Sequence, residues 1–289
     1  MFLTPREGTT SRLDLLRDFS LEMTGKDVNS LHEASSGIPT GTRVNVTYLA
    51  HEDLRLRVTA ARSVRDLGLV PVPHVSARRL RSRGALDEFL GALRADGNTD
   101  RLFLVAGDPR TPEGPYTDTL AIIESGVLEE NGVREVGISG YPEGHPEIPD
   151  DTLWRSLEDK VFALHERAID ATVTTQFGFD ADTVLHWVEK VRGRGVTVPV
   201  RVGVPGPAGA KRLLTYASRF GVGTSAGIAK KYGLSLTNLM SKTGPDRFIN
   251  TLGERYNEQR HGELHLHFYT FGGIQATAEW VLQYKESTP

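Results

Sequence analysis

The chain has 289 residues, of which 38% are hydrophobic, and its 34 basic and 37 acidic residues leave a formal charge of −3. This charge balance does not favour a polyanionic partner, so we expect neither a nucleic-acid nor a membrane interface. The absence of cysteine excludes disulfides, thiolate nucleophiles and cysteine-ligated metals. The first residues lack the apolar core of a signal peptide, and no apolar run reaches about 18 residues, so the sequence predicts a cytoplasmic protein.

Short apolar or β-branched runs alternate with amphipathic segments along the chain. The runs expected to form strands are 19–22, 43–48, 69–74, 102–105, 135–138, 171–176, 198–204 and 264–269. Apolar spacings of three and four predict helices between them, for example over 54–67, 85–94, 181–192 and 209–220. Eight such units predict a single (βα)8 barrel domain, a TIM barrel, over residues 1–289. No G-x-G-x-x-G motif follows the first strand, which argues against a doubly wound dinucleotide-binding sheet.

The connection between the seventh and eighth expected strands, 221–262, is long enough to hold more than one helix. Its stretch 221–227 is typical of a helix start, with Thr224 or Ser225 as the cap. Backbone N–H groups at such a start can bind an anion, although an ordinary cap is the more frequent use.

Polar and aromatic residues close most of the expected strands. In a barrel of this type the carboxyl ends of the strands meet at one mouth, where active sites lie. The residues expected there are Glu22, Thr47, Tyr48, His74, Gly107, Asp108, Gln176, Tyr269 and the stretch 141–147. The sequence therefore predicts a polar site at the mouth, although the general polarity of strand ends explains part of the pattern.

The stretch 141–147 reads Tyr-Pro-Glu-Gly-His-Pro-Glu and follows the fifth expected strand. Two prolines fix the backbone and the glycine allows it to turn, so the loop holds a phenol, an imidazole and two carboxylates in a rigid frame. We interpret it as a binding loop. The alternative is an ordinary turn with solvated charges.

Three polar residues at different strand ends suit acid catalysis and ligand recognition. Partial burial is expected to keep Glu22 protonated, which suits a general acid; its alternative is a surface or capping glutamate. Asp108 precedes a proline, and its carboxylate is placed to stabilise a positive charge unless it only initiates a turn. Gln176 offers a donor and an acceptor to the edge of a heterocycle, or it is an ordinary strand-end amide.

His265 and His267 lie on the same face of the last expected strand, where two imidazoles suit a metal ion. No third ligand lies at a supporting spacing, so we predict no metal site and expect both histidines in the interior or bottom layer of the barrel. A metal-dependent barrel hydrolase that combines them with His74 and Asp108 is an alternative.

Taken in order and with their separations, the strand-end motifs resemble those of the methylenetetrahydrofolate reductase family, and the resemblance spans nearly the whole chain. The matching segments are Ser20-Leu21-Glu22, Val46-Thr47-Tyr48, Pro73-His74, Gly107-Asp108, 141–147 (Tyr-Pro-Glu-Gly-His-Pro-Glu), 175–180 (Thr-Gln-Phe-Gly-Phe-Asp) and 267–270 (His-Phe-Tyr-Thr).

This resemblance implies a (βα)8 barrel that reduces 5,10-methylenetetrahydrofolate to 5-methyltetrahydrofolate with NAD(P)H, usually through bound FAD. It implies that Glu22 is the general acid that opens the five-membered ring to a 5-iminium cation. Asp108 and Gln176 would hold the pterin, with Tyr269 as a further substrate contact and the charge of Asp108 favouring the cation in a sheltered site. The cofactor contacts implied are Thr47, Tyr48, His74, Tyr116, Tyr141, His145 and Lys160.

The chain departs from the family pattern in the flavin region. Ala106 stands where many members have arginine, and Glu158 and Asp159 replace neutral or basic residues beside the retained Lys160. Carboxylates next to a diphosphate are unfavourable. We therefore expect FAD to be weakly bound or lost, with NADH delivering the hydride directly. An ordinary FAD enzyme and a folate-binding barrel without catalysis are the alternatives.

Overall fold

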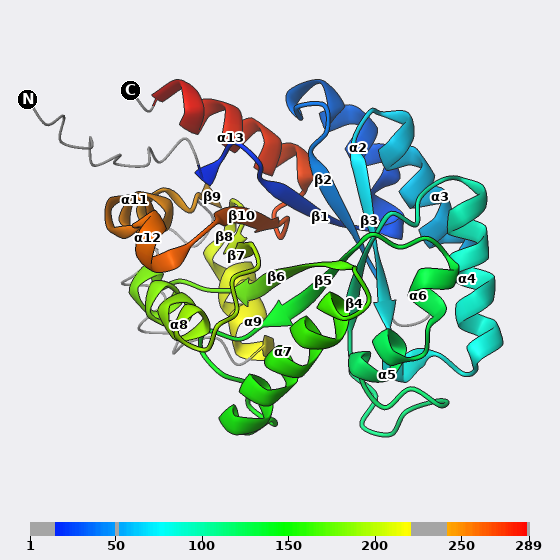
Figure 1. The fold of residues 1–289 in the computed structure, drawn as a ribbon. Coiled ribbons are helices and arrows are strands. Elements are labelled where there is room, and N and C mark those ends of the chain that lie inside the picture. The colour runs from blue at the N-terminus through cyan, green and yellow to red at the C-terminus, as the bar shows by residue number, and fades with distance from the viewer. Residues whose placement is uncertain (1–14, 50–51, 221–241, 288–289) are drawn as a thin grey trace, which may run out of the picture.

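Eight parallel strands form a closed barrel in which neighbours along the chain pair and the last strand returns to the first (Figure 1). This computed structural model describes residues 15–49, 52–220 and 242–287. The barrel strands are β1 (Ser20–Thr24), β2 (Arg43–Thr47), β3 (Val70–Ser76), β4 (Arg101–Val105), β5 (Glu135–Gly140), β6 (Asp170–Phe177), β7 (Val200–Pro205) and β10 (Leu264–Tyr269). The predicted TIM barrel is confirmed. That all 289 residues belong to this one domain stays a prediction.

Helices follow the strands and surround the barrel (Figure 1). They are α2 (Val28–Ala34), α3 (Leu54–Asp66), α4 (Arg83–Ala95), α5 (Thr119–Glu124), α6 (Val127–Glu130), α7 (Asp150–His165), α8 (Ala181–Gly193), α9 (Ala210–Phe220), α11 (Asp246–Arg255), α12 (Glu258–His261) and α13 (Ile274–Ser287). Polar caps explain where several of them begin: Asp53 accepts from the backbone of Arg55, and Ser82 accepts from that of Ala85. Such caps satisfy amides that the first helical turn leaves unpaired.

The connection between β7 and β10 contains α11 and α12, which confirms the prediction of more than one helix there. It also contains both strands of a small antiparallel pair, in which β8 (Ala208–Gly209) meets β9 (Lys242–Thr243). The helix start predicted over 221–227 lies outside the described residues.

The register between β6 and β7 shifts by one residue near the mouth. Thr174 lies opposite Arg201, but Phe177 lies opposite Gly203, so β6 uses one more residue than β7. The Thr175 hydroxyl fills the irregular step by accepting a hydrogen bond of 2.8 Å from the Gly203 amide. A bulge of this kind bends a strand and redirects the side chains beside it.

Charged side chains close the end of the barrel opposite the mouth. Arg201 has a side chain only 5% exposed and donates to a carboxylate oxygen of Asp18 at 2.6 Å. Arg43 pairs there with Glu135, and His265 lies 2.7 Å from Glu263. These contacts occupy the bottom layer, which places His265 where the sequence predicted and away from the mouth.

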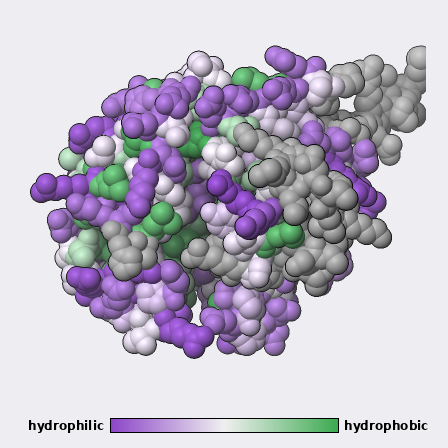
Figure 2. Space-filling model, turned by 180° about the vertical axis from the view of Figure 1, so that it is seen from behind, coloured by the Kyte–Doolittle hydropathy of each residue, from purple (hydrophilic) through white to green (hydrophobic). Residues whose placement is uncertain are grey.

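The described surface is mostly hydrophilic, and its apolar spots are small and separate on the face seen in Figure 2. The large apolar side chains exposed among the described residues are Leu49, Phe162 and Leu282, each from a different part of the chain. No helix in the described part of the chain has the length and apolar character needed to cross a membrane.

Candidate active site

Glu22 is the middle residue of β1 and contacts an imidazole of the last strand. Because side chains alternate along a strand, Ser20 and Glu22 share one face of β1, and Ser20 is in register with His267 of β10. The Nε2 atom of His267 is 3.5 Å from the Glu22 carboxylate, and its Nδ1 atom is 2.8 Å from the Ser20 hydroxyl. Serine, imidazole and carboxylate therefore form one chain in the upper barrel.

A second imidazole, that of His74 on β3, is buried near this carboxylate. The amide of Asn45 donates to its Nε2 atom at 3.2 Å, and the ring of Phe103 packs 4.7 Å from it. Burial lowers the pKa of His74 to about 4, although the charge of Glu22 opposes this effect. His74 is therefore neutral at physiological pH, with its proton on Nδ1, because Nε2 accepts from the amide.

The Glu22 carboxyl is ionised when the protein is alone. Its burial raises the pKa, but the hydrogen bond with His267, the charge of His74 and the neighbouring Thr47 outweigh this and lower the pKa below its usual value. At neutral pH the His267 contact is the one that acts, because His74 is uncharged there. The prediction that burial keeps Glu22 protonated is therefore wrong for the protein by itself.

Tyr269 ends β10 and completes this part of the mouth. Its hydroxyl donates to the Thr175 carbonyl at 3.0 Å, and its ring packs edge-on against His267 at 4.9 Å. Burial, with the nearby charge of Glu22, raises the pKa of Tyr269 well above its usual value, so the phenol stays protonated. The β6 bulge matters here because it leaves the Thr175 carbonyl available to Tyr269.

The loop after β5 lies beside the end of β6. Gln176 donates from Nε2 to the Gly144 carbonyl at 3.2 Å, which ties the loop to the strand. Tyr141 and His145 pack edge to face at 5.4 Å, and the His145 Nδ1 atom accepts from the Glu147 amide at 3.1 Å. The rigid loop predicted from its prolines is thus held by its own side chains and by Gln176.

Asp108 lies in the loop after β4, at the rim of the barrel. Its side chain is 75% exposed and pairs with Arg79 at 2.9 Å. The prediction that it lies in a sheltered site is wrong for the protein by itself. Arg79 also lies 5.7 Å from the ring of Tyr48, which Arg57 covers at 4.1 Å, so two guanidinium groups border Tyr48 at this rim.

The flavin region around α7 carries little net positive charge. Burial lowers the pKa of Lys160, while Asp118 and Asp159 lie close enough to oppose that effect. Glu158 instead points to α8, where it pairs with Arg194 at 2.7 Å, so it does not act on a ligand beside Lys160 as the sequence had predicted. One lysine between two carboxylates does not fit a flavin diphosphate, which binds best to unopposed cations.

Two other residues predicted to contact a cofactor differ in their surroundings. Tyr116 is only 6% exposed and belongs to the hydrophobic core. The Thr47 hydroxyl is buried and makes no hydrogen bond of ordinary geometry, although it lies near enough to Glu22 to help lower that pKa.

The two histidines of β10 do not converge on one point. His265 belongs to the bottom layer with Glu263, whereas His267 contacts Glu22 higher in the barrel. Among residues 15–49, 52–220 and 242–287, no three histidine, aspartate or glutamate side chains are grouped so that they could hold a metal ion.

Sequence reasoning missed the contacts made by Glu22, His74 and Tyr269. Ser20 and Thr175 appeared only within the segments that match the family, Asn45 was not named, and His267 was expected in the interior with no contact to Glu22. Strand alternation was the available signal: Ser20 and Glu22 on β1, like His267 and Tyr269 on β10, are two residues apart and so share a face. What the spacing does not reveal is which faces meet across the barrel.

Comparison with known proteins places the chain in a family. A sequence profile described as methylenetetrahydrofolate reductase matches residues 22–284. A shorter segment is similar to methylenetetrahydrofolate reductase 1 of Schizosaccharomyces pombe, at 38% identity over 69 residues, and to methylenetetrahydrofolate reductase 2 of Saccharomyces cerevisiae, at 35% over 72 residues. Each of these alignments covers 24% of this chain but only 11% of the relative.

A solved structure resembles the whole barrel. It is an uncharacterized protein from Clostridium thermocellum that is described as binding two copies of 5-methyl-5,6,7,8-tetrahydrofolic acid. The superposition has a TM-score of 0.59 and covers 95% of this chain and 98% of that one, with 10% sequence identity. At that identity the likeness shows a shared fold alone.

Proposed function

This chain belongs to the methylenetetrahydrofolate reductase family, and on that premise we propose that it reduces 5,10-methylenetetrahydrofolate to 5-methyltetrahydrofolate with a reduced nicotinamide, NADH being the favoured donor. The observation that carries the proposal is the chain of Ser20, His267 and Glu22 at the barrel mouth. It joins a carboxyl group to a neighbouring imidazole at the end of the barrel where enzymes of this fold have their active sites.

Ring opening needs a proton, which the ionised Glu22 must first acquire. A folate bound over the mouth removes water from the carboxylate, whose side chain is 21% exposed, and this desolvation raises its pKa. His267 faces that carboxylate through Nε2 and relays the proton, while Ser20 holds its Nδ1 side. Glu22 then protonates the ring nitrogen that leaves as its bond to the methylene carbon breaks.

The resulting 5-iminium cation accepts a hydride from the nicotinamide at its exocyclic carbon. One proton and one hydride are consumed, and the methylene carbon becomes a methyl group. Gln176 would hydrogen-bond the edge of the pterin through its amide oxygen, because only its Nε2 atom is used in donating to the Gly144 carbonyl. Asp108 contributes negative charge that favours the cation, and this contribution grows when bound folate displaces water from the rim. Tyr269 is the further substrate contact at this mouth.

Replacing Glu22 with Gln tests the proton donor. We expect folate-dependent NADH oxidation to fall by a factor of about 10² to 10⁴, the usual contribution of general acid–base catalysis, while folate binding measured by calorimetry persists. Glu33→Gln is the matched control, because that glutamate is exposed on α2. Unchanged turnover of Glu22→Gln would remove this residue from its role. Folate binding without any folate-dependent NADH oxidation in the native protein would favour the folate-binding barrel instead.

We further propose that the hydride passes directly from NADH, without resident FAD. The charge around Lys160, where Asp118 and Asp159 oppose it, supports this. The purified protein should therefore show no absorbance band near about 450 nm after dialysis, since oxidised flavin absorbs there through its own conjugated ring. A stoichiometric band that persists through dialysis would contradict direct transfer and leave the reductase proposal standing.

A further inference from the structure

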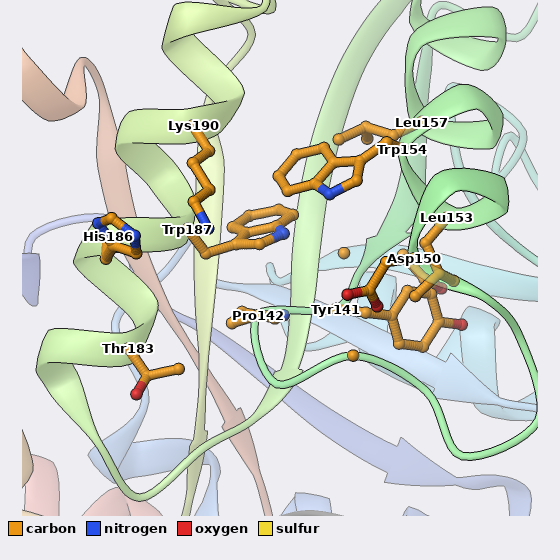
Figure 3. Close-up of a pocket in the computed structure, with 13 residues that line it drawn as sticks. Tyr141, Pro142, Asp150, Leu153, Trp154, Leu157, Thr183, His186, Trp187 and Lys190 are labelled. Carbon is orange, nitrogen blue, oxygen red and sulfur yellow. The ribbon is translucent and has the colours of Figure 1, made fainter.

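A cavity lies outside the barrel, between α7 and α8. It has a volume of about 270 Å³ and reaches from the end of β5 to the facing sides of the two helices (Figure 3). The loop residues Tyr141, Pro142 and Gly144 form its floor. Gly144 is also the residue that Gln176 holds at the mouth, so one loop separates this cavity from the candidate active site.

Two indole rings form a rigid aromatic wall. Trp154 of α7 and Trp187 of α8 stack at 5.8 Å with 24° between their planes, and both line the cavity (Figure 3). Arg194 covers Trp154 at 4.6 Å. Trp187 packs so closely on Gly140 that an added Cβ there would lie 2.6 Å from its ring, which keeps the indole in place. The two indoles are therefore held in place before any ligand arrives.

Polar groups of both signs border this wall. Asp150, in the first turn of α7, places a carboxylate on one side, and Lys190 of α8 places an ammonium on the other, near Trp187 (Figure 3). Thr183 and His186 add further hydrogen-bonding groups along α8. A carboxylate accepts from an amino substituent, an ammonium pairs with an anion, and indole faces stack on flat rings.

From this combination we propose that the α7–α8 cavity is a binding site for a planar amino-substituted heteroaromatic ring that carries one anionic group, such as a nucleoside monophosphate. A volume of 270 Å³ lies just below the roughly 300–1,000 Å³ of sites for drug-sized ligands, so it suits one such ring rather than a whole dinucleotide. The cavity shares the loop after β5 with the mouth, but ligand binding in it does not depend on the proposed reduction.

Tryptophan fluorescence with AMP as the probe tests this site without any turnover. Trp154 and Trp187 are two of the three tryptophans in the chain, and the third, Trp280, packs against Phe268 and Tyr284 elsewhere. We expect AMP to quench the fluorescence saturably, with a Kd below about 1 mM. Absence of saturable quenching at millimolar AMP would overturn the proposal.

Variants then separate specific binding from general attraction of charge. Lys190→Gln should weaken AMP binding about fivefold and leave adenosine binding unchanged, because it removes one exposed ionic contact. Trp154→Ala should weaken both ligands about tenfold through lost stacking. Arg155→Gln is the matched control, since Arg155 is exposed on α7 and does not line the cavity. Equal weakening by Lys190→Gln and Arg155→Gln would overturn the proposal, and thermal denaturation shows whether each variant is folded.

Discussion

The two imidazoles beside Glu22 have different partners, and this decides what each can do. His267 contacts the carboxylate and the Ser20 hydroxyl, so it is placed to move a proton. His74 accepts from Asn45 and is kept neutral by burial, so it is placed to hold its position at the mouth without adding charge. A cation at His74 would repel the iminium intermediate that we propose, which gives its low pKa a chemical consequence.

Neutral His74 makes a pH-dependent contribution to stability. Its pKa falls from 6.5 in the unfolded chain to about 4 in the fold, so the unfolded state takes up the proton first as pH falls. This contribution to the free energy of unfolding is fully present above about pH 6.5 and is lost as the pH falls to about 4. The loss reaches about 2 to 3 kcal/mol by pH 4.5. His74→Gln should therefore show a smaller loss of unfolding free energy between pH 7.5 and 4.5, measured by urea denaturation.

Two comparisons make that measurement specific. The Glu22 carboxylate, whose pKa is lowered, loses its contribution in the same direction but only as pH falls through and below 4.5. His165→Gln serves as the control, because His165 is exposed at the end of α7 and its loss should leave the pH slope unchanged. Equal slopes for the native protein and His74→Gln would show that His74 is not kept neutral.

At the scale of elements, the bulge in β6 links the barrel to the candidate active site. At the bulge the Thr175 carbonyl accepts a hydrogen bond from the Tyr269 hydroxyl. The Thr175 side-chain hydroxyl accepts one from the Gly203 amide. Gly203 permits this close approach, because an added Cβ would lie 2.4 Å from the Thr175 carbonyl oxygen. The bulge and the glycine opposite it therefore act as one unit.

Gly203→Ala should destabilise the protein by about 1 to 3 kcal/mol, since backbone atoms must move to admit the methyl group. Gly193→Ala is the matched control: it lies at the end of α8, nothing is within 4 Å of its added Cβ, and alanine favours the helix there. Chemical denaturation of both variants checks the difference. A Gly203→Ala protein as stable as Gly193→Ala would show that the bulge adapts freely.

The element scale also shows how far sequence patterns reach. Alternating and amphipathic periodicities located all eight barrel strands and the helices α3, α4, α8 and α9, because these periods follow from local backbone geometry. The bulge was not predicted, since Thr174 to Phe177 continues the strand pattern without interruption. The bulge depends on β7, because Gly203 has no side chain and the backbone of β6 can therefore approach it closely.

For the molecule as a whole, the barrel has one polar end, which holds the candidate active site, and one end closed by ion pairs. Arg201 of β7 reaches Asp18, which precedes β1, so their contact joins segments 183 residues apart. It lies beside the place where β10 and β1 complete the barrel. Closure of the sheet and neutralisation of a buried guanidinium therefore occur together.

Arg201→Met should reduce the free energy of unfolding by about 1.5 to 3 kcal/mol through the loss of charge-assisted hydrogen bonds in a side chain that is 5% exposed. Arg62→Met removes a pair whose arginine is 56% exposed, so it should cost less than about 1 kcal/mol. Denaturation at low and high salt checks this, because screening should weaken only the exposed pair. Equal costs for the two variants would contradict a structural role for the bottom layer.

The sequence by itself determined the barrel and the polar residues at its strand ends, because strand period and strand direction are local properties that the fold preserves. Only the tertiary structure decided the protonation of Glu22, the exposure of Asp108 and the cavity between Trp154 and Trp187. Each of these depends on side chains that are distant in the chain, since a pKa or a cavity is set by all the neighbours of a group and not by its sequence position.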